Sequence, residues 1–208
     1  MRGKIPSTAV FDLGGVLIDW NPRYLYRKLL GGDEAEVERF LSTVCTQSWN
    51  EQQDAGRTFA EGCAVLKAAH PDQSELIDAW FPGYEEMLGG EVEGSVEILS
   101  ELRANQTRLY ALSNWSTETF PFAVRRFEFL RWFQGIVLSG EAKIIKPDPR
   151  LFQVLFEKYA VDPRDAVYVD DRENNVEAAR RLGMHGILFT DAGSLRRQLG
   201  GLGLLYKR

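Results

Sequence analysis

The chain has 208 residues, of which 44% are hydrophobic and 26% are charged, and its formal net charge is −5 at pH 7. These proportions are typical of a globular protein that buries a sizeable core without disulfides. The negative charge argues against a protein that binds nucleic acid through general basicity. An anionic ligand would have to be attracted locally, by a metal ion, a lysine or helix N-termini.

The two cysteines and the N-terminal segment predict a cytoplasmic protein. Cys45 and Cys63 stand apart without a CxxC or CxxH pattern, which predicts buried thiols rather than a disulfide framework or a metal knuckle. The N-terminal segment carries charge but no long apolar run, and no apolar stretch reaches the length that spans a membrane. We therefore expect neither a membrane nor a nucleic acid as a partner. The oligomeric state cannot be deduced from these features.

A short buried strand opens the chain, and helices follow it. Apolar residues on both sides of Asp12 predict a strand over 7–14 that ends in a glycine turn. The next segments have helical patterns, with capping residues at their starts and Gly or Pro near their ends. These predicted helices cover 21–32, 33–45, 58–71 and 74–88, the last with a break at Pro82. No strand pattern appears between Asp19 and about Gly90.

Beyond about residue 91, strands alternate with helices. The predicted strands cover 107–114, 135–140, 165–171 and 185–190. The predicted helices cover 95–105, 116–127 (with a break at Pro121), 149–160, 174–184 and 193–203. This alternation predicts parallel βαβ units, so the fold class is α/β with a Rossmann-like doubly wound parallel sheet. We expect a core formed by 1–18 and 91–208, with an all-helical insert over 19–90.

Polar side chains stand where the predicted strands end, which is where open parallel sheets bind ligands. They are Asp12, Ser113, Asn114, Lys146, Asp170 and Asp171. Each has a structural alternative, such as a turn, a helix cap or a solvated loop position. The pair Asp170–Asp171 is harder to explain in that way, because adjacent carboxylates repel each other and usually need a cation. Together these residues indicate chemistry at one sheet edge.

Four segments in this order resemble the motifs of the haloacid dehalogenase superfamily of aspartate-nucleophile hydrolases. They are FDLGGVL (11–17), ALSN (111–114), KPDPRLF (146–152) and YVDDRENNVEAA (168–179). The resemblance extends to about residue 191, and the insert is similar to the helical cap domain that many members carry. The combination of DLGGV with DD and Asn resembles most a bacterial branch that includes an α-D-glucose-1-phosphate phosphatase.

The resemblance implies a Mg²⁺-dependent phosphatase that hydrolyses a small phosphorylated metabolite, for example a sugar phosphate, through an aspartyl-phosphate on Asp12. It implies that Mg²⁺ is bound by the carboxylates of Asp12 and Asp171 and by the carbonyl of Gly14. Asp170 would hold metal-bound water. The metal would allow the anionic nucleophile to approach an anionic phosphate.

The same resemblance implies how the phosphate is held. Ser113 and Lys146 would bind phosphoryl oxygens together with the backbone amide of Asn114. Gly15 would let the backbone approach the phosphate closely. Arg23, at the entrance to the insert, is a further candidate to meet the substrate's charge, although arginines at helix starts are usually solvated.

One position departs from the pattern of most phosphatases in this superfamily, which carry a second Asp where this chain has Gly14. That Asp is a general acid and base, a role worth about 10²–10⁴-fold in rate. The leaving group can be acidic enough to need little help, as in an anomeric sugar phosphate. Alternatively, Asp19 or Asp54 of the insert replaces the missing group, or the protein is slow or specialised for binding.

Three other functions are considered for the same residues. In a 2-haloacid dehalogenase, Asp12 would attack carbon without a metal, but those enzymes usually lack the acidic pair at 170 and 171. A non-catalytic HAD-like protein would bind a phosphorylated ligand and keep the site intact. A phosphomutase is a weaker candidate, because shuttling a proton makes the missing Asp more costly.

Overall fold

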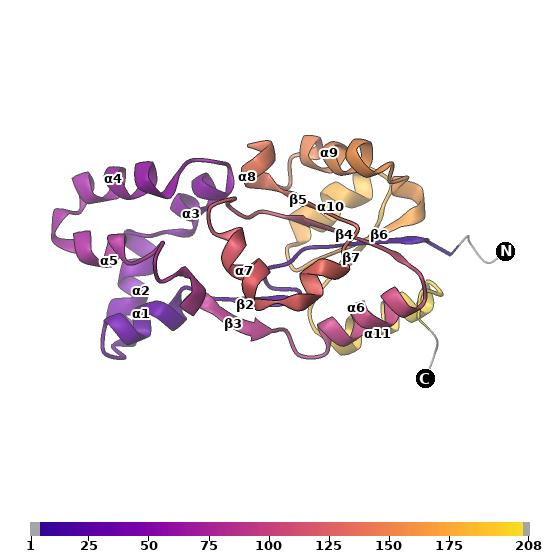
Figure 1. Ribbon diagram of the computed structural model, residues 1–208, viewed down its shortest axis with the longest axis horizontal. Coiled ribbons are helices and arrows are strands. Elements are labelled where there is room, and N and C mark those ends of the chain that lie inside the picture. Colours follow the sequence, from indigo (N-terminus) through magenta and orange to yellow (C-terminus); the bar gives the residue numbers. More distant parts are fainter. Residues whose placement is uncertain (1–4, 206–208) are drawn as a thin grey trace.

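The computed structural model describes residues 5–205, and its centre is a five-stranded parallel sheet (Figure 1). The strands, in sheet order, are β5 (Gly135–Leu138), β4 (Arg108–Ser113), β1 (Thr8–Phe11), β6 (Ala166–Asp170) and β7 (His185–Leu188). In the middle, Phe11 is level with Ala111 on one side and Val169 on the other. Because every strand runs the same way, all carboxyl ends meet at one edge. The predicted doubly wound sheet is confirmed.

Helices cover both faces of this sheet, and the alternation of side chains along β1 shows how. Val10 belongs to a buried cluster that includes apolar residues of α9 (Pro149–Tyr159) and α10 (Glu173–Arg181). Its neighbours in the strand, Ala9 and Phe11, point to the other face, whose cluster includes residues of α6 and α11. Those two helices are α6 (Ser95–Ala104) and α11 (Ala192–Gly201).

Shorter helical segments lie between these elements. They are α7 (Phe120–Arg126), α8 (Ser139–Ala142) and single 3₁₀ segments at Pro71–Gln73, Tyr84–Met87, Glu128–Trp132 and Pro163–Asp165. Pro121 was expected to break a helix over 116–127. Instead it lies in the first turn of α7, where the missing N–H costs nothing, so the helix starts there.

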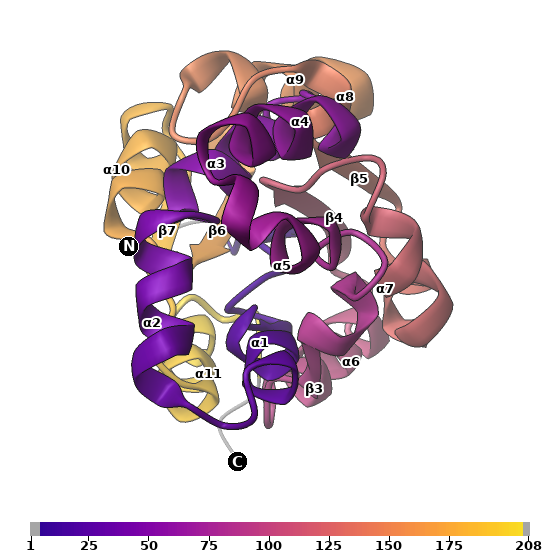
Figure 2. The ribbon, with the colours of Figure 1, turned by 90° about the vertical axis from the view of Figure 1, so that its left-hand side faces the viewer.

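The helices of the insert lie together beyond the carboxyl edge of the sheet (Figures 1 and 2). They are α1 (Arg23–Leu29), α2 (Glu34–Thr43), α3 (Gln47–Asp54), α4 (Phe59–Ala69) and α5 (Ser74–Asp78). Two predicted caps are present: Asp33 accepts a hydrogen bond from the Glu36 amide, and Thr58 forms a reciprocal capping box with Glu61.

The insert differs from the predicted elements in three places. A two-stranded antiparallel ribbon, β2 (Ile18–Trp20) and β3 (Leu88–Glu91), stands where no strand was expected. Strands this short show no usable alternation. Helix α3 was not predicted. The helix expected over 74–88 with a break at Pro82 ends earlier, at Asp78, since the chain turns before that proline. Both predicted boundaries, 18/19 and 90/91, fall in the ribbon, and the division into core and cap stays a prediction.

The predictions about thiols and membranes can be compared with the described residues. Cys45 and Cys63 are buried and free. Within residues 5–205, no helix combines the length and apolarity needed to cross a bilayer. The cellular location stays a prediction.

Candidate active site

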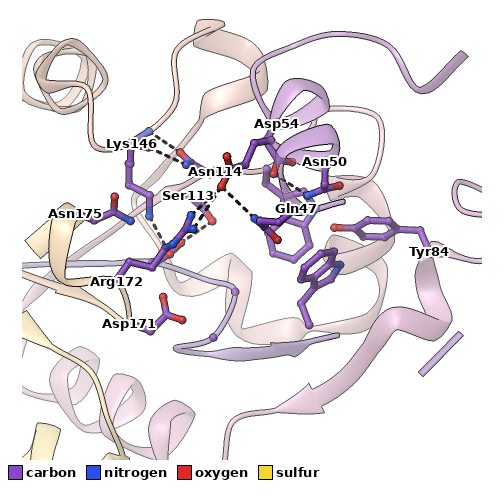
Figure 3. A pocket seen from close by; sticks show the side chains of 16 residues that line it. Gln47, Asn50, Asp54, Tyr84, Ser113, Asn114, Lys146, Asp171, Arg172 and Asn175 are labelled. Carbon is purple, nitrogen blue, oxygen red and sulfur yellow. Dashed lines mark hydrogen bonds and ion pairs between the residues drawn. The ribbon is translucent and has the colours of Figure 1, made fainter. Parts of the chain in front are cut away.

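A cavity of about 370 Å³ lies at the carboxyl edge of the sheet and is lined by residues of both the core and the insert (Figure 3). Seven of the predicted site residues line it: Asp12, Gly14, Gly15, Ser113, Asn114, Lys146 and Asp171. They come from segments more than 150 residues apart in the chain. The parallel topology brings them together, because each follows a strand at the same edge.

Asp12 is held in a fixed orientation directly after β1. One carboxylate oxygen, Oδ1, accepts hydrogen bonds from the Leu13 amide and from Ser113 Oγ, both at 2.7 Å. The other, Oδ2, lies 2.9 Å from Lys146 Nζ. Burial raises the pKa of Asp12 to about 7, while the positive charge of Lys146 opposes that rise. The carboxylate is therefore oriented by three donors and still only partly compensated in charge.

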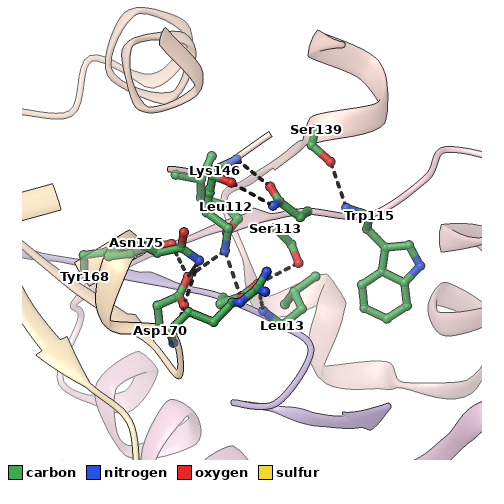
Figure 4. A network of polar contacts seen from close by, with 12 residues as sticks. Leu13, Leu112, Ser113, Trp115, Ser139, Lys146, Tyr168, Asp170 and Asn175 are labelled. Atoms are coloured by element: carbon green, nitrogen blue, oxygen red, sulfur yellow. Dashed lines mark hydrogen bonds and ion pairs between the residues drawn. The ribbon is translucent and has the colours of Figure 1, made fainter. Parts of the chain in front are cut away.

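Lys146 is buried, and its ammonium group joins two carboxylates (Figure 4). Nζ lies 2.7 Å from Asp170 Oδ2 in addition to its contact with Asp12, and it donates to the Leu112 carbonyl oxygen at 3.0 Å. Burial by itself would lower the pKa of Lys146, but the charges of Asp12 and Asp170 outweigh it and raise the pKa. The three donors of the ammonium are all engaged.

Asp170 is fully buried and surrounded by protein donors (Figure 4). Besides Lys146, it accepts hydrogen bonds from the Tyr168 hydroxyl, the Asn175 amide group and the backbone amide of Arg172. Burial alone would raise the pKa of Asp170, but Lys146 and these donors lower it. These contacts position Lys146, and the role expected with metal-bound water stays a prediction.

Asn114 holds the Lys146 segment through its side chain. Its Oδ1 accepts a hydrogen bond from the Lys146 amide at 2.8 Å, and its Nδ2 donates to the Lys146 carbonyl oxygen at 3.2 Å. Sequence reasoning had assigned only the backbone amide of Asn114 to the site. The side chain thus ties the irregular loop that carries Lys146 to the end of β4, near Asp12.

The three carboxyl groups at this edge form a cluster suited to a hard cation. Asp12, Asp170 and Asp171 each offer an oxygen, and these oxygens lie within 4.8 Å of one another. Burial, followed by the charge of Asp170, raises the pKa of Asp171. One lysine faces three carboxylates. The Gly14 carbonyl, which also lines the cavity, accepts no backbone hydrogen bond from residues 5–205.

Position 15 needs a glycine for two reasons, its backbone conformation and the nearby Asp171 side chain. Its φ is +75°, in the left-handed region, and a Cβ there would lie 2.4 Å from Asp171 Oδ2. The absent side chain leaves room for the Asp171 carboxylate. This reason differs from the close approach to phosphate that the resemblance implied.

The structure does not bring Arg23 to the cavity. Its guanidinium forms a two-fold hydrogen bond with the Glu38 carboxylate, with the shorter contact at 2.5 Å, on the surface of the insert. Asp19 also lies outside the cavity lining and accepts a hydrogen bond from the Tyr24 hydroxyl. Asp54, by contrast, is buried and lines the cavity.

Sequence reasoning missed most of the residues that the insert contributes. One face of α3 and two aromatic side chains of the insert line the cavity: Gln47, Asn50, Glu51, Asp54, Trp20 and Tyr84. Trp115, which follows β4 in the core, also lines it. The spacing of the four α3 residues, at i, i+3, i+4 and i+7, marks one helix face. The same spacing of polar residues is typical of a solvated helix face, so the sequence alone does not distinguish a solvated face from one that lines a cavity.

Comparison with known proteins agrees with the resemblance seen in the sequence. A family model described as haloacid dehalogenase-like hydrolase matches residues 6–183. Drimenol cyclase drtB of Aspergillus calidoustus is 26% identical over 195 residues, which are 91% of this chain but 35% of that protein. The chain therefore spans about a third of this relative.

Two relatives of similar length have different chemistries in their names. The phosphorylated carbohydrates phosphatase of Thermotoga maritima is 24% identical and covers 87% of this chain and 83% of its own. The (S)-2-haloacid dehalogenase 4A of Burkholderia cepacia is also 24% identical, with 89% and 83% covered. Similarity at this level does not choose between phosphorus and carbon as the atom attacked.

A solved structure shares the fold. A HAD family enzyme of Bacteroides thetaiotaomicron, crystallised with magnesium and inorganic phosphate, superposes with a TM-score of 0.68 at 24% identity. The match covers 89% of this chain and 95% of the other.

Proposed function

The chain belongs to the haloacid dehalogenase-like hydrolases, and we propose that within this family it is a Mg²⁺-dependent phosphatase of a small phosphate monoester. The observation that carries the proposal is the cluster of Asp12, Asp170 and Asp171 with oxygens within 4.8 Å. An attack on the carbon of a haloacid needs one carboxylate. Three carboxylates facing one lysine instead suit an enzyme that adds a divalent cation.

Several donors of the described structure fit that cation. The carboxylates of Asp12 and Asp171 and the carbonyl of Gly14 would hold Mg²⁺, which prefers a few carboxylates plus water and phosphate oxygens. When bound, Mg²⁺ would supply the positive charge that lets an anionic nucleophile and an anionic phosphate meet. The crystallised enzyme of Bacteroides thetaiotaomicron, which holds magnesium and phosphate, supports this choice of metal.

The residues of the chain account for the chemical steps. An Asp12 oxygen forms a bond to phosphorus while the bond from phosphorus to the ester oxygen breaks, and the electron pair leaves with the alcohol. Lys146 and the Ser113 hydroxyl, which contact Asp12 directly, stabilise the charge that spreads over the phosphoryl oxygens. Water then attacks phosphorus and releases phosphate from Asp12.

The size of the cavity favours a small substrate. About 370 Å³, closed by the insert on one side, holds a phosphate and a small leaving group, which supports a metabolite of sugar-phosphate size. The Thermotoga maritima relative, whose name gives phosphorylated carbohydrates as its substrates, supports the same class.

An assay with 4-nitrophenyl phosphate and with 2-chloropropionate tests the proposal. The protein should hydrolyse the phosphate ester only with Mg²⁺ present, and EDTA should abolish the reaction. Asp12→Asn should reduce kcat by at least about 10³-fold while the far-UV circular dichroism spectrum is unchanged. The protein would be a dehalogenase if it released chloride from 2-chloropropionate without metal and released no phosphate from 4-nitrophenyl phosphate when Mg²⁺ was present.

A further inference from the structure

The chemistry of ester cleavage requires a proton that the core side of the cavity does not offer. An alkoxide is a poor leaving group unless an acid protonates it as the bond to phosphorus breaks. Lys146 has its three donors engaged, and Asp12 is the nucleophile. At Gly14, beside the nucleophile, a Cβ would meet no atom within 4 Å. Of the other charged core residues in the lining, Asp171 is assigned to the metal and Arg172 pairs with Glu51, which leaves the insert as the source of the acid.

Among the insert residues that line the cavity, Asp54 is the buried carboxyl group. Glu51, on the same face of α3, is committed to an ion pair with Arg172 at 3.2 Å and is more exposed. The phenol of Tyr84 is a much weaker acid, because burial raises its pKa well above the ordinary value. Gln47 and Asn50 carry amides, which do not donate a proton to a leaving group.

Asp54 is held by three hydrogen bonds, one each from the loop after β4, from α3 and from α8. Its Oδ1 accepts from the Ser116 amide at 3.1 Å, two residues beyond Asn114. Its Oδ2 accepts from Asn50 Nδ2 at 3.0 Å. Its main-chain carbonyl accepts from Ser139 Oγ at 2.5 Å. Each carboxyl oxygen can serve a second partner, so the group keeps room for a proton of its own.

The surroundings of Asp54 favour its neutral form. It is 9% exposed and is the last residue of α3, where the partial negative charge of the helix terminus disfavours an anion. Burial raises the pKa of Asp54 to about 8, and the charges of Glu51 and Asp12 add to that rise, against the Ser116 amide and Arg172. Asp54 therefore offers a neutral carboxyl group in the lining of the cavity that Asp12 also lines.

We propose, on the basis of the phosphatase function above, that Asp54 of α3 donates the proton to the leaving oxygen of the substrate. As Asp12 bonds to phosphorus, the bond to the ester oxygen breaks and its electron pair takes the Asp54 proton. The products are the alcohol, phosphorylated Asp12 and an Asp54 carboxylate. In the second half-reaction the carboxylate accepts a proton from the attacking water, which restores neutral Asp54. The insert thus completes the catalytic machinery of the core.

A series of para-substituted phenyl phosphates, from 4-nitrophenyl phosphate to phenyl phosphate, tests this role in the Mg²⁺-loaded protein. Nitrophenolate leaves without protonation, whereas phenolate is a poorer leaving group. Asp54→Asn should lower kcat/KM for phenyl phosphate by at least tenfold more than for 4-nitrophenyl phosphate, and by on the order of 10²-fold more for an alkyl phosphate. The comparison is a ratio within one variant, so a misfolded fraction does not change it.

Two further variants sharpen the result. Asp19→Asn is the matched control, because Asp19 is an insert carboxylate outside the cavity lining, and its dependence on the leaving group should follow the wild type. Adding Gly14→Asp to Asp54→Asn should recover phenyl phosphate turnover, since the position has room for a side chain. Equal effects of Asp54→Asn on every ester would overturn the proposal. A wild-type protein inactive on all of them with Mg²⁺ would overturn the phosphatase function itself.

Discussion

Replacing Asp54 by Asn should stabilise the fold, and the gain should grow with pH. A buried carboxyl group with a raised pKa opposes folding whenever it is ionised in the unfolded chain. The asparagine keeps an oxygen that can accept from the Ser116 amide and carries no ionisable proton, but its NH2 group replaces the oxygen that accepts from Asn50 Nδ2. The loss of that hydrogen bond is the same at every pH, so the pH dependence of the gain reports the ionisation of Asp54. The substitution therefore removes an electrostatic cost while it preserves the contact that ties α3 to the β4 loop.

The magnitude follows from the pKa of Asp54, which folding raises from 3.8 to about 8. Between these pH values the folded chain keeps a proton that the unfolded chain has lost, so stability falls as pH rises. Each pH unit costs up to 1.36 kcal/mol, which makes about 4 kcal/mol at pH 7 an upper bound. Relaxation around a buried anion reduces this figure. We therefore expect the difference in free energy of unfolding between Asp54→Asn and the wild type to increase by about 2–3 kcal/mol from pH 5 to pH 7.5.

Urea unfolding of both proteins in EDTA at pH 5 and pH 7.5 measures this gain without a contribution from bound metal. Asp78→Asn is the control, because Asp78 forms an exposed ion pair with Lys67 and should change stability by less than about 0.5 kcal/mol at either pH. A difference between wild type and Asp54→Asn that is the same at both pH values would refute the reasoning, since it would show that Asp54 does not hold an additional proton in the fold.

Two substitutions in the core test the charge balance of the site. Lys146→Met leaves the buried carboxylates of Asp12 and Asp170 without their common partner, so the free energy of unfolding should fall by about 3–5 kcal/mol; an equally stable variant in urea would contradict this. Gly15→Ala places a methyl group on Asp171 Oδ2, so half-maximal phosphatase activity should need at least about tenfold more Mg²⁺. An unchanged Mg²⁺ concentration at half-maximal activity would contradict the assignment of Asp171 as a metal ligand.

The sheet and its edge were predictable because topology constrains them strongly. Strands buried on both faces read as continuous apolar runs, as in the segment before Asp12, and parallel strands must end at the same edge. Residues placed at strand ends therefore met in space even though they are far apart in sequence. Ser113 Oγ lies 2.7 Å from Asp12 Oδ1 across 101 positions of the chain.

The contribution of the insert was much less predictable. Helix α3 carries mostly polar residues, and its buried side chains include Asn50, Gln53 and Asp54, so no apolar stripe marks its inner face. Which polar face is buried depends on packing against the core. Asp19 and Asp54 were equivalent candidates in the sequence, and packing places only Asp54 in the cavity lining. Arg23 is likewise absent from that lining, and its guanidinium pairs with Glu38 on the neighbouring helix.

The covalent step at Asp12 is the centre of this account, and trapping it is the most direct measurement. The Mg²⁺-loaded protein would be mixed with a ³²P-labelled phosphate ester, quenched in acid within the first turnover, and digested to locate the label. We predict acid-stable label that borohydride treatment removes, converting residue 12 to homoserine, and no label on Asp12→Asn. Turnover without a phosphorylated residue, or label on any other residue, would contradict the account.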